Sequence, residues 1–304
     1  MRIVLIGQAA FGEKVLDAFL ARGECVAGVF CPPDAPGRPD PLGQLAQRHG
    51  LPVHQPRRMR AAGVYETFAA LQPDLAVMAF VTDIVPERLL TYPPLGTIQF
   101  HPSLLPRHRG GSAINWAVIQ GETETGLTIF WPDQGIDTGP ILLQKTVAIG
   151  PDDTTGSLYF NKLFPLGVEA LGEAVDQVRA GTAPRRPQDE ALATAEPLCT
   201  EALTGIDWAR PAGQVYNLIR GANPQPGAAT AWRGRRLKIF DCERRAQGLA
   251  GRPGEVLAVA GDGFAVAAAD GGVWVKRVQL DGEAKTKAGE FAAAHGLAAG
   301  DVLG

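Results

Sequence analysis

The chain has 304 residues, of which 45% are hydrophobic and 20% charged, and its formal net charge is −3. This composition fits a globular protein of two ordinary domains and excludes a strongly basic nucleic-acid binder. Four scattered cysteines show neither metal-ligand spacing nor a disulfide pattern, the N-terminus has no signal-peptide layout, and no apolar run could span a bilayer. The sequence therefore predicts a cytoplasmic protein with no metal and no membrane partner.

Strand-like apolar runs alternate with helical periodicity over the first 150 residues. Strands are expected at residues 2–6, 25–30, 75–80, 97–100, 127–131 and 141–147, and helices at 11–21, 41–49, 61–71 and 112–120. This alternation predicts an α/β fold with a Rossmann-like, mostly parallel sheet covered on both faces. Ligands of such sheets bind at the carboxyl ends of the strands, and His101 directly follows one of them.

The second half of the chain has a different pattern. Residues 154–180 have the period of one long helix or a helix pair, and residues 183–203 have no clear period. Beyond them, a helix at 211–221 precedes short strands at 229–232, 236–241, 255–259, 264–268 and 273–280 and a helix at 290–295. Such strands favour a small, OB-like β-barrel. The expected organisation is a catalytic domain over 1–182, a linker over 183–203 and a barrel domain over 204–304.

The two halves also differ in charge. Residues 204–304 contain 13 Lys and Arg against 10 Asp and Glu, a charge of +3, which leaves −6 for residues 1–203. The mild basic bias of the C-terminal part permits an anionic partner without requiring one.

Two stretches contain the residues with chemical potential. Gln99 and His101 are two residues apart at a predicted strand end, so their side chains point to the same side and could polarise a carbonyl oxygen together. The run DQGIDTG at 133–139 supplies Asp137, a carboxylate that would hold the imidazole in its useful tautomer or favour its protonated form. The set predicts acyl transfer or acyl hydrolysis without a Ser or Cys nucleophile.

Each of these residues also fits a purely structural role. His101 could be a core histidine, and Asp133 and Asp137 could cap turns. His108 lies between two arginines and is expected to be a solvated loop residue. The run GQAAFG at 7–12 lacks both the dinucleotide and the phosphate-loop pattern, so it is expected to form a tight turn without a ligand.

The run HPSLLPRHRGGSAINW at 101–116, together with DQGIDTG, resembles the folate-dependent formyltransferases. The resemblance covers nearly the whole chain. Residues 7–12, 40–43, 107–116 and 163–165 are most similar to the hydrolase domain of 10-formyltetrahydrofolate dehydrogenases, whereas residues 204–304 resemble the C-terminal domain of methionyl-tRNA formyltransferases.

This resemblance implies a set of site residues. His101 and Asp137 match two members of the family's catalytic Asn-His-Asp trio, and Gln99 occupies the Asn position, with the same carboxamide on a chain one methylene longer. The formyl donor would be 10-formyltetrahydrofolate, bound without a metal. Its pterin ring would pair with backbone groups of two segments: Asp83, Ile84 and Val85, and Asp133, Gln134, Gly135 and Ile136.

The sequence leaves the formyl acceptor open. Hydrolysis by water or transfer to a small amine, including an amino sugar, is the first interpretation. Transfer to initiator methionyl-tRNA is the alternative, favoured by the domain order and opposed by the short segment at 33–40, where tRNA enzymes usually have a longer basic insertion. A non-catalytic folate-binding module is a third hypothesis, which Gln99 motivates and which His101 and Asp137 oppose.

Overall fold

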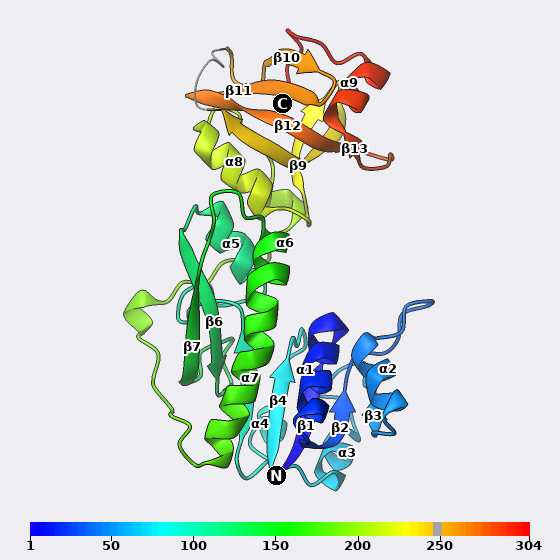
Figure 1. The fold of residues 1–304 in the computed structure, drawn as a ribbon, viewed down its shortest axis with the longest axis vertical. Coiled ribbons are helices and arrows are strands. Elements are labelled where there is room, and N and C mark those ends of the chain that lie inside the picture. The colour runs from blue at the N-terminus through cyan, green and yellow to red at the C-terminus, as the bar shows by residue number, and fades with distance from the viewer. Residues whose placement is uncertain (246–250) are drawn as a thin grey trace. The chain divides into compact units, whose positions relative to one another are not determined.

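The computed structural model describes residues 1–245 and 251–304, and the chain forms two compact units (Figure 1). The first unit comprises Met1–Gly111, Gly126–Val147 and Phe160–Ala195, and the second comprises Ser112–Thr125, Ala148–Tyr159 and Glu196–Gly304. This division differs from the boundaries at 182 and 203 expected from the sequence. Two segments of the expected catalytic domain, Ser112–Thr125 and Ala148–Tyr159, belong to the second unit. The expected linker at 183–203 is divided between the two units after Ala195.

A seven-stranded sheet forms the centre of the first unit, in the order β3-β2-β1-β4-β5-β6-β7. The pairings from β3 to β5 are parallel, and β5 and β6 pair antiparallel, which confirms the mostly parallel sheet. The strands are β1 (Arg2–Gly7), β2 (Cys25–Phe30), β3 (Val53–His54), β4 (Leu75–Ala79), β5 (Thr97–His101), β6 (Glu124–Phe130) and β7 (Ile141–Ala148).

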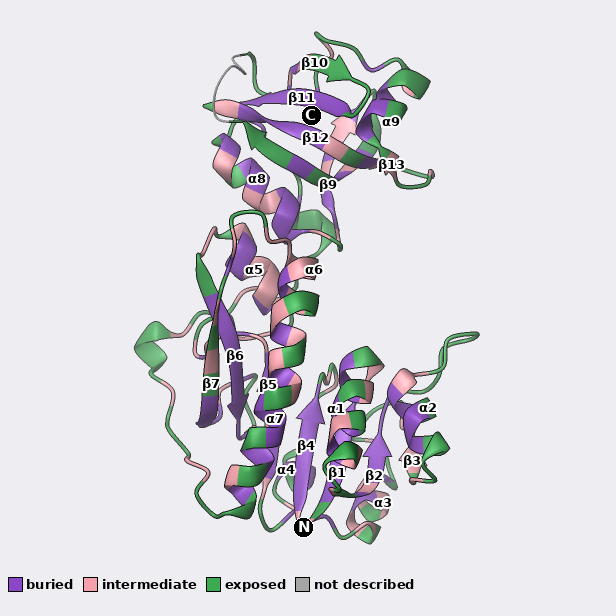
Figure 2. Cartoon of the chain, in the orientation of Figure 1, coloured by how far each residue is buried: buried purple, intermediate pink, exposed green. Residues whose placement is uncertain are grey.

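Both faces of this sheet are buried, as Figure 2 shows for β1 and β4. In β1, Ile3 and Leu5 contribute to one core and Val4 and Ile6 to the other, because successive side chains of a strand point to opposite faces. Burial on both faces explains why the strand reads as a continuous apolar run instead of an alternating one.

Helices cover the two faces of the sheet. The first core contains residues of α1 (Ala9–Ala21), α2 (Pro41–Arg48) and α7 (Phe164–Arg179), and the second contains residues of α3 (Val64–Ala70) and α4 (Glu87–Leu90). Helix α2 begins where the sequence signals it, since Pro41 is at its first position and the Asp40 carboxylate accepts a hydrogen bond from Leu42 N at 3.0 Å.

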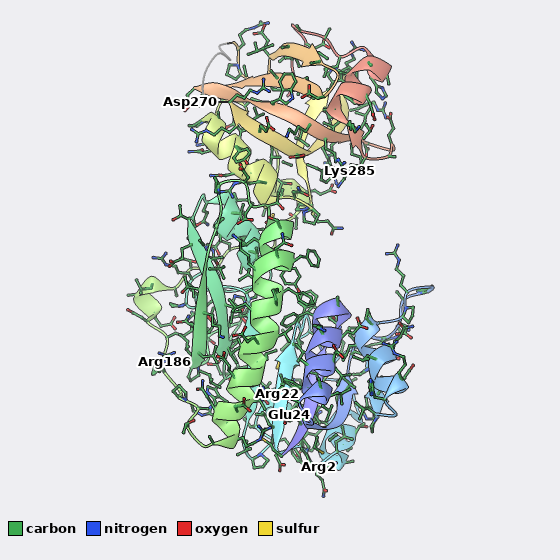
Figure 3. All side chains as sticks on the ribbon, in the orientation of Figure 1. Arg2, Arg22, Glu24, Arg186, Asp270 and Lys285 are labelled. Carbon is green, nitrogen blue, oxygen red and sulfur yellow. The ribbon has the colours of Figure 1, made fainter. Side chains whose placement is uncertain are left out.

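The helical pattern expected at 154–180 contains three consecutive segments. They are α6 (Thr155–Leu158), a π-helical turn (Tyr159–Leu163) and α7. A capping box starts the first one, because Thr154 and Ser157 bond each other's backbone N–H groups. Where α7 runs beside the end of α1, Arg22 Nη2 bonds Asp176 Oδ1 at 2.6 Å and lies 3.6 Å from Glu24 (Figure 3).

An antiparallel sheet forms the core of the second unit, in the order β10-β11-β12-β9-β8, with β13 paired to β12. The strands of this sheet are β8 (Ala228–Trp232), β9 (Arg235–Arg245), β10 (Val256–Ala260), β11 (Gly263–Ala268), β12 (Gly271–Leu280) and β13 (Thr286–Lys287). Besides α6, the unit includes the helices α5 (Ala113–Ile119), α8 (Ala212–Gly221) and α9 (Ala288–His295). Helices α8 and α9 contribute Ile219 and Phe291 to its hydrophobic core.

The C-terminal residues link the two outer strands of this sheet. Asp301 O accepts from Val256 N on β10 at 2.8 Å, and Gly304 N donates to Ala231 O on β8 at 2.9 Å. Within the described residues, β8 and β10 do not pair directly, so the small barrel expected from the sequence is an antiparallel sheet whose two edges are bridged by the end of the chain.

Candidate active site

His101 is the last residue of β5, at the carboxyl edge of the parallel strands, and its side chain is buried. Its Nε2 lies 2.8 Å from the backbone oxygen of His108. A carbonyl oxygen only accepts hydrogen bonds, so Nε2 must carry a proton. This contact fixes the orientation of the ring and leaves Nδ1 as the nitrogen that faces the rest of the site.

Asp137 lies on the other side of the His101 ring. Its Oδ2 is 3.5 Å from His101 Nδ1 and accepts a hydrogen bond from Gly110 N at 2.8 Å. Because both ring nitrogens then face acceptors, the geometry is complementary to the doubly protonated imidazolium. The Nδ1–Oδ2 separation exceeds the 2.7–3.2 Å of a well-formed N–H···O bond, so this contact leaves Nδ1 open to a second partner.

The motif DQGIDTG folds into the turn that presents Asp137. The Asp133 carboxylate accepts from Gly135 N at 3.0 Å and from Thr138 Oγ1 at 2.6 Å, as expected for an aspartate that caps a turn. A Cβ at Gly139 would lie 1.8 Å from the Trp131 carbonyl oxygen, so this position requires glycine. The spacing of the motif therefore has a geometric cause.

Two polar side chains, one from β6 and one from β7, hold the loop that follows β5. Thr128 of β6 donates from Oγ1 to Ser103 O at 2.7 Å and accepts from Leu105 N at 3.1 Å. Gln144 of β7 donates to Leu105 O at 2.9 Å. These bonds set the path of the loop that supplies the His108 carbonyl to His101. The sequence analysis did not identify Thr128 and Gln144, although their polarity within apolar strands was visible.

Gln99 lies two residues before His101 on β5, between Met78 of β4 and Phe130 of β6. It is half-buried, and among the described residues none forms a hydrogen bond with its carboxamide. The structure therefore places an available amide donor on the strand face that also presents the imidazole.

His108 differs from its expected role. The sequence predicted a solvated loop residue, but the side chain is 3% exposed and the backbone adopts a left-handed conformation with φ of +55°. The prediction was wrong because charged neighbours do not require the residue between them to be solvated. Instead, the backbone bonds to residue 194 through His108 N and to His101 through its carbonyl group, which turns the imidazole inward.

The two segments predicted to hold the pterin lie next to each other. Gln134 Nε2 donates to Glu87 Oε2 at 2.6 Å, which joins the 133–137 turn to the segment that follows residues 83–85. Ile84 and Ile136 are 76% and 67% exposed, whereas Val85 is buried. These neighbouring segments thus each present an apolar side chain at the surface.

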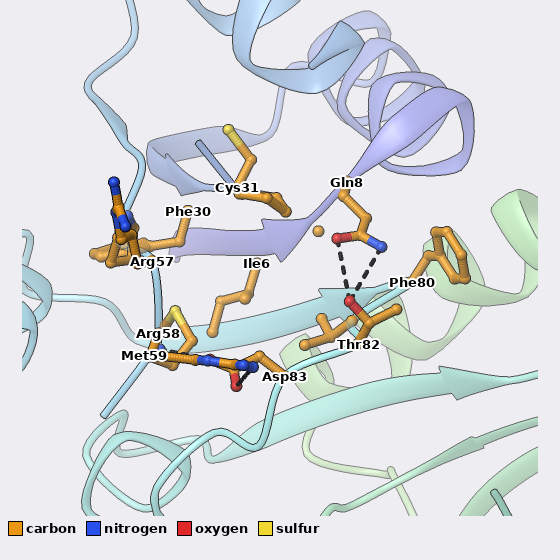
Figure 4. Close-up of a pocket in the computed structure, with 14 residues that line it drawn as sticks. Ile6, Gln8, Phe30, Cys31, Arg57, Arg58, Met59, Phe80, Thr82 and Asp83 are labelled. Atoms are coloured by element: carbon orange, nitrogen blue, oxygen red, sulfur yellow. Dashed lines mark hydrogen bonds and ion pairs between the residues drawn. The ribbon is translucent and has the colours of Figure 1, made fainter. Parts of the chain in front are cut away.

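Asp83 directs its carboxylate away from these segments and into a separate network. It accepts from Met59 N at 2.6 Å and from Arg58 Nη1 at 3.3 Å. These residues line a cavity of about 130 Å³ beside Gln8, whose amide bonds Thr82 (Figure 4). The cavity is not lined by Gln99, His101 or Asp137.

Gly7 and Gln8, which connect β1 to α1, line this cavity. The tight turn expected over 7–12 is shorter than predicted, because residues 9–12 already form the first turn of α1. A Cβ at Gly7 would lie 2.5 Å from the Ala79 carbonyl oxygen, so this glycine allows the ends of β1 and β4 to approach each other. The close approach is the physical reason for glycine at the end of β1. Within the described residues, no three His, Cys, Asp or Glu side chains are grouped closely enough to hold a metal, and no helix is long and apolar enough to cross a membrane.

Comparison with known families identifies the chain. Residues 1–175 match the family model described as formyl transferase, and residues 200–296 match its C-terminal domain. The chain belongs to the formyltransferase family. It is 41% identical to the methionyl-tRNA formyltransferase of Trichlorobacter lovleyi over 308 residues, which cover 99% of this chain and 96% of that protein. It is 43% identical to the cytosolic 10-formyltetrahydrofolate dehydrogenase of Mus musculus over 86% of this chain but only 29% of the mouse protein.

Two solved structures share the fold of this chain. HypX from Aquifex aeolicus, solved in complex with tetrahydrofolic acid, superposes with a TM-score of 0.71 at 21% identity over 96% of this chain, which spans about half of HypX (47%). The sugar 3N-formyltransferase WlaRD superposes with a TM-score of 0.69 at 17% identity, over 93% of this chain and 99% of its own. At these identities the likeness concerns the fold of the formyltransferase.

Proposed function

We propose that this formyltransferase transfers the formyl group of 10-formyltetrahydrofolate to the amino group of methionyl-tRNA. The observation that carries the proposal is the end-to-end match to a methionyl-tRNA formyltransferase, which covers 99% of this chain and 96% of the relative. The dehydrogenase match has a similar identity but covers 29% of a much longer protein. Hydrolysis or transfer to a small amine was the first interpretation of the sequence, and the comparisons favour its alternative.

The segment at 83–85 has the properties that a pterin requires. Within the described part of the chain, the backbone N–H and C=O groups of Asp83, Ile84 and Val85 form no hydrogen bond, so they are available to the edge of a planar ring. Exposed Ile84 and Ile136 provide apolar contact for its faces. Burial of apolar surface with a few oriented backbone groups is the usual composition of a small-molecule site.

The geometry supports direct attack of the acceptor amine on the formyl carbon. The new C–N bond forms as the carbonyl oxygen becomes an oxyanion, which Gln99 and the Nδ1–H of His101 stabilise. Asp137 accepts the proton that the amine loses. The bond between the formyl carbon and N10 then breaks, and N10 receives that proton as tetrahydrofolate leaves. No covalent enzyme intermediate is required.

The second unit supplies positive charge for a polyanionic acceptor. The hairpin of β8 and β9 contains Arg233, Arg235, Arg236 and Lys238 within six residues. Each of these cations has a carboxylate partner inside the unit. Glu201 binds Arg236 and Lys238, and Arg235 and Arg233 lie against Glu283 and Asp301. Four cations against three carboxylates leave the cluster with an excess of one positive charge. Binding of tRNA through such residues is expected to weaken steeply as salt concentration rises.

Hydrolysis of 10-formyltetrahydrofolate is the second candidate, and two observations favour it. Gln99 replaces the asparagine of the family's trio, and the 33–40 segment is a short turn closed by the bond from Arg38 N to Ala35 O at 2.9 Å. This short turn lacks the longer basic insertion that tRNA enzymes usually have there. Water would then take the place of the amine in the same geometry.

The two candidates are separated by following tetrahydrofolate release from 10-formyltetrahydrofolate, first without an acceptor and then with charged initiator methionyl-tRNA. Transfer predicts turnover only with the charged tRNA and formation of formylmethionyl-tRNA. Turnover in water alone, unchanged by tRNA, would establish the hydrolase instead. Folate binding without turnover under either condition would contradict both.

Gln99→Asn tests whether this residue controls the choice of acceptor. The substitution shortens the carboxamide by one methylene and keeps its donor and acceptor groups. If Gln99 favours water, the Asn variant should lower the ratio of hydrolysis to transfer by about tenfold, which corresponds to about 1.4 kcal/mol. An unchanged ratio would remove Gln99 as a reason for the hydrolase candidate.

A further inference from the structure

Residues 184–195, here named the strap, follow α7 and lie along both loops of the candidate site. Arg186 pairs with Ile141 at the start of β7 through two backbone bonds of 2.7 and 3.0 Å, and Figure 3 shows Arg186 at this position. At the other end, Arg109 N donates to Thr194 O at 2.9 Å, and Thr194 Oγ1 accepts from His108 N at 2.8 Å. The strap is therefore an ordered part of the first unit, although its sequence was expected to be a linker.

Gln188 occupies the middle of the strap and uses the full hydrogen-bonding capacity of its carboxamide. Its Nε2 donates to the backbone oxygens of Asp137 and Gly139, both at 2.8 Å. Its Oε1 accepts from Arg109 Nε at 3.2 Å and from Nη2 at 2.8 Å. The amide orientation is unambiguous, because the two carbonyl oxygens require donors and the guanidinium requires an acceptor.

Arg109 completes a closed set of contacts around Asp137. Glu190 binds the adjacent edge of its guanidinium, with Nη1–Oε2 at 2.9 Å and Nη2–Oε1 at 2.6 Å, and hydrogen bonding to Glu190 is the main reason why the pKa of Arg109 is raised. The next residue, Gly110, donates its backbone N–H to Asp137 Oδ2. Gln188 thus holds the backbone of Asp137 and, through Arg109, supports the residue that holds its carboxylate.

Asp137 needs such support because its backbone is in the left-handed region, with φ of +56°. A non-glycine residue pays free energy to adopt this conformation, so surrounding contacts must maintain it. Two of the bonds from Gln188 fall on the carbonyl groups at and just after this residue. The position of the carboxylate relative to His101 consequently depends on the strap.

We propose that Gln188 is a positioning residue for Asp137, and that the strap keeps the carboxylate at its distance from His101. This inference rests on the proposed function, because it assigns Asp137 a role in formyl transfer. Gln188 does not contact the reacting atoms in this scheme. It acts by holding the turn at 137–139 against Arg109.

The test compares Gln188→Glu and Gln188→Met with Gln44→Glu, a matched change at an exposed position of α2. The Glu variant keeps the acceptor for Arg109 but turns a carboxylate toward two carbonyl oxygens, and the Met variant removes all four bonds. Both Gln188 variants should lower kcat by about 10- to 100-fold with the KM for 10-formyltetrahydrofolate within about twofold of the original value. Gln44→Glu should match the unmodified protein.

Hydrogen exchange of the Gly110 amide provides a readout that does not require turnover. This amide donates to Asp137 Oδ2, so its protection should fall in both Gln188 variants and stay unchanged in Gln44→Glu, at temperatures well below each thermal midpoint. Full kcat and full protection of Gly110 in the Gln188 variants would overturn the inference. If protection falls but His101→Ala keeps full turnover, the positioning effect stands and the proposed function fails.

Discussion

Asp137→Asn should remove most of the activity while preserving the local fold. The variant keeps an oxygen that accepts from Gly110 N, so the turn retains its hydrogen bond. It loses the negative charge 3.5 Å from His101 Nδ1. At this separation and an effective dielectric constant of about 20, the attraction between unit charges is about 5 kcal/mol. If about half of this survives screening and relaxation, the loss of about 2–3 kcal/mol lowers kcat/KM by about 100-fold. Because Asn cannot accept the proton that the amine loses, the measured decrease should be at least this large.

The assay is initial-rate release of tetrahydrofolate at saturating acceptor. Asp270→Asn is the matched control, because the Asp270 carboxylate accepts from Ala212 N at 2.7 Å in the second unit, in a role that Asn also fills. Its kcat/KM should stay within about twofold of the unmodified protein. An Asp137→Asn enzyme that retains kcat/KM within about threefold would refute the electrostatic reasoning, since the charge would then contribute less than about 1 kcal/mol.

Three further outcomes test the fold and its titrating groups. Phe11→Ala should lower the free energy of unfolding in urea by about 3–5 kcal/mol, because the ring is buried and its centroid lies 4.5 Å from that of Phe100. Phe160→Ala is the control: this side chain is 60% exposed, so the loss should be below about 1 kcal/mol. Burial lowers the pKa of His54 below its ordinary 6.5, so the folded state binds fewer protons than the unfolded state in this pH range. The free energy of unfolding should therefore fall as the pH drops from 6.5 toward the folded-state pKa. A His54→Gln variant whose thermal midpoint keeps the same pH dependence would contradict this. Burial also raises the pKa of the Cys31 thiol to about 12, so mild alkylation near pH 8 should modify exposed Cys25 first, and equal labelling of both would disprove the burial of Cys31.

The sheet and its long helices were predictable because their patterns are local and long. The strand expected at residues 2–6 contains the continuous apolar run 3–6, and the structure extends this strand by one residue to Gly7. The short elements β3 and α4 were not predicted, since Val53–His54 and Glu87–Leu90 are too short to show a period of either kind. Tertiary hydrogen bonds define such elements, and a local window contains no sign of them.

The second unit shows a different limit of sequence reasoning. The predicted ends of strands β8 to β12 differ from those in the structure by at most four residues. The direct pairing of the outer strands that would close a barrel is nevertheless not found among the described strands. Closure depends on the C-terminal residues 300–304. Gly300 and Asp301 bond the backbone of Val256, and Gly304 N donates to Ala231 O. This segment has no strand pattern, because it contributes isolated backbone bonds at positions set by the three-dimensional path of the chain.

In the candidate site, the reacting residues were predictable from the sequence, but the residue that holds them in position was not. His101 was expected at a strand end and Asp137 in the loop after the strand at 127–131, and their chemistry suggested that the fold brings them together. The structure places them 3.5 Å apart, although β5 and β6 run antiparallel and the loop must turn back to reach His101. Gln188 was not expected there, because it lies 51 residues beyond Asp137 in a segment without periodicity. An acid and a base are recognised by their chemistry, whereas a supporting amide is recognised only by its partners. The four hydrogen bonds of Gln188 therefore make the strap, and not the strand ends alone, the determinant of how closely Asp137 approaches His101.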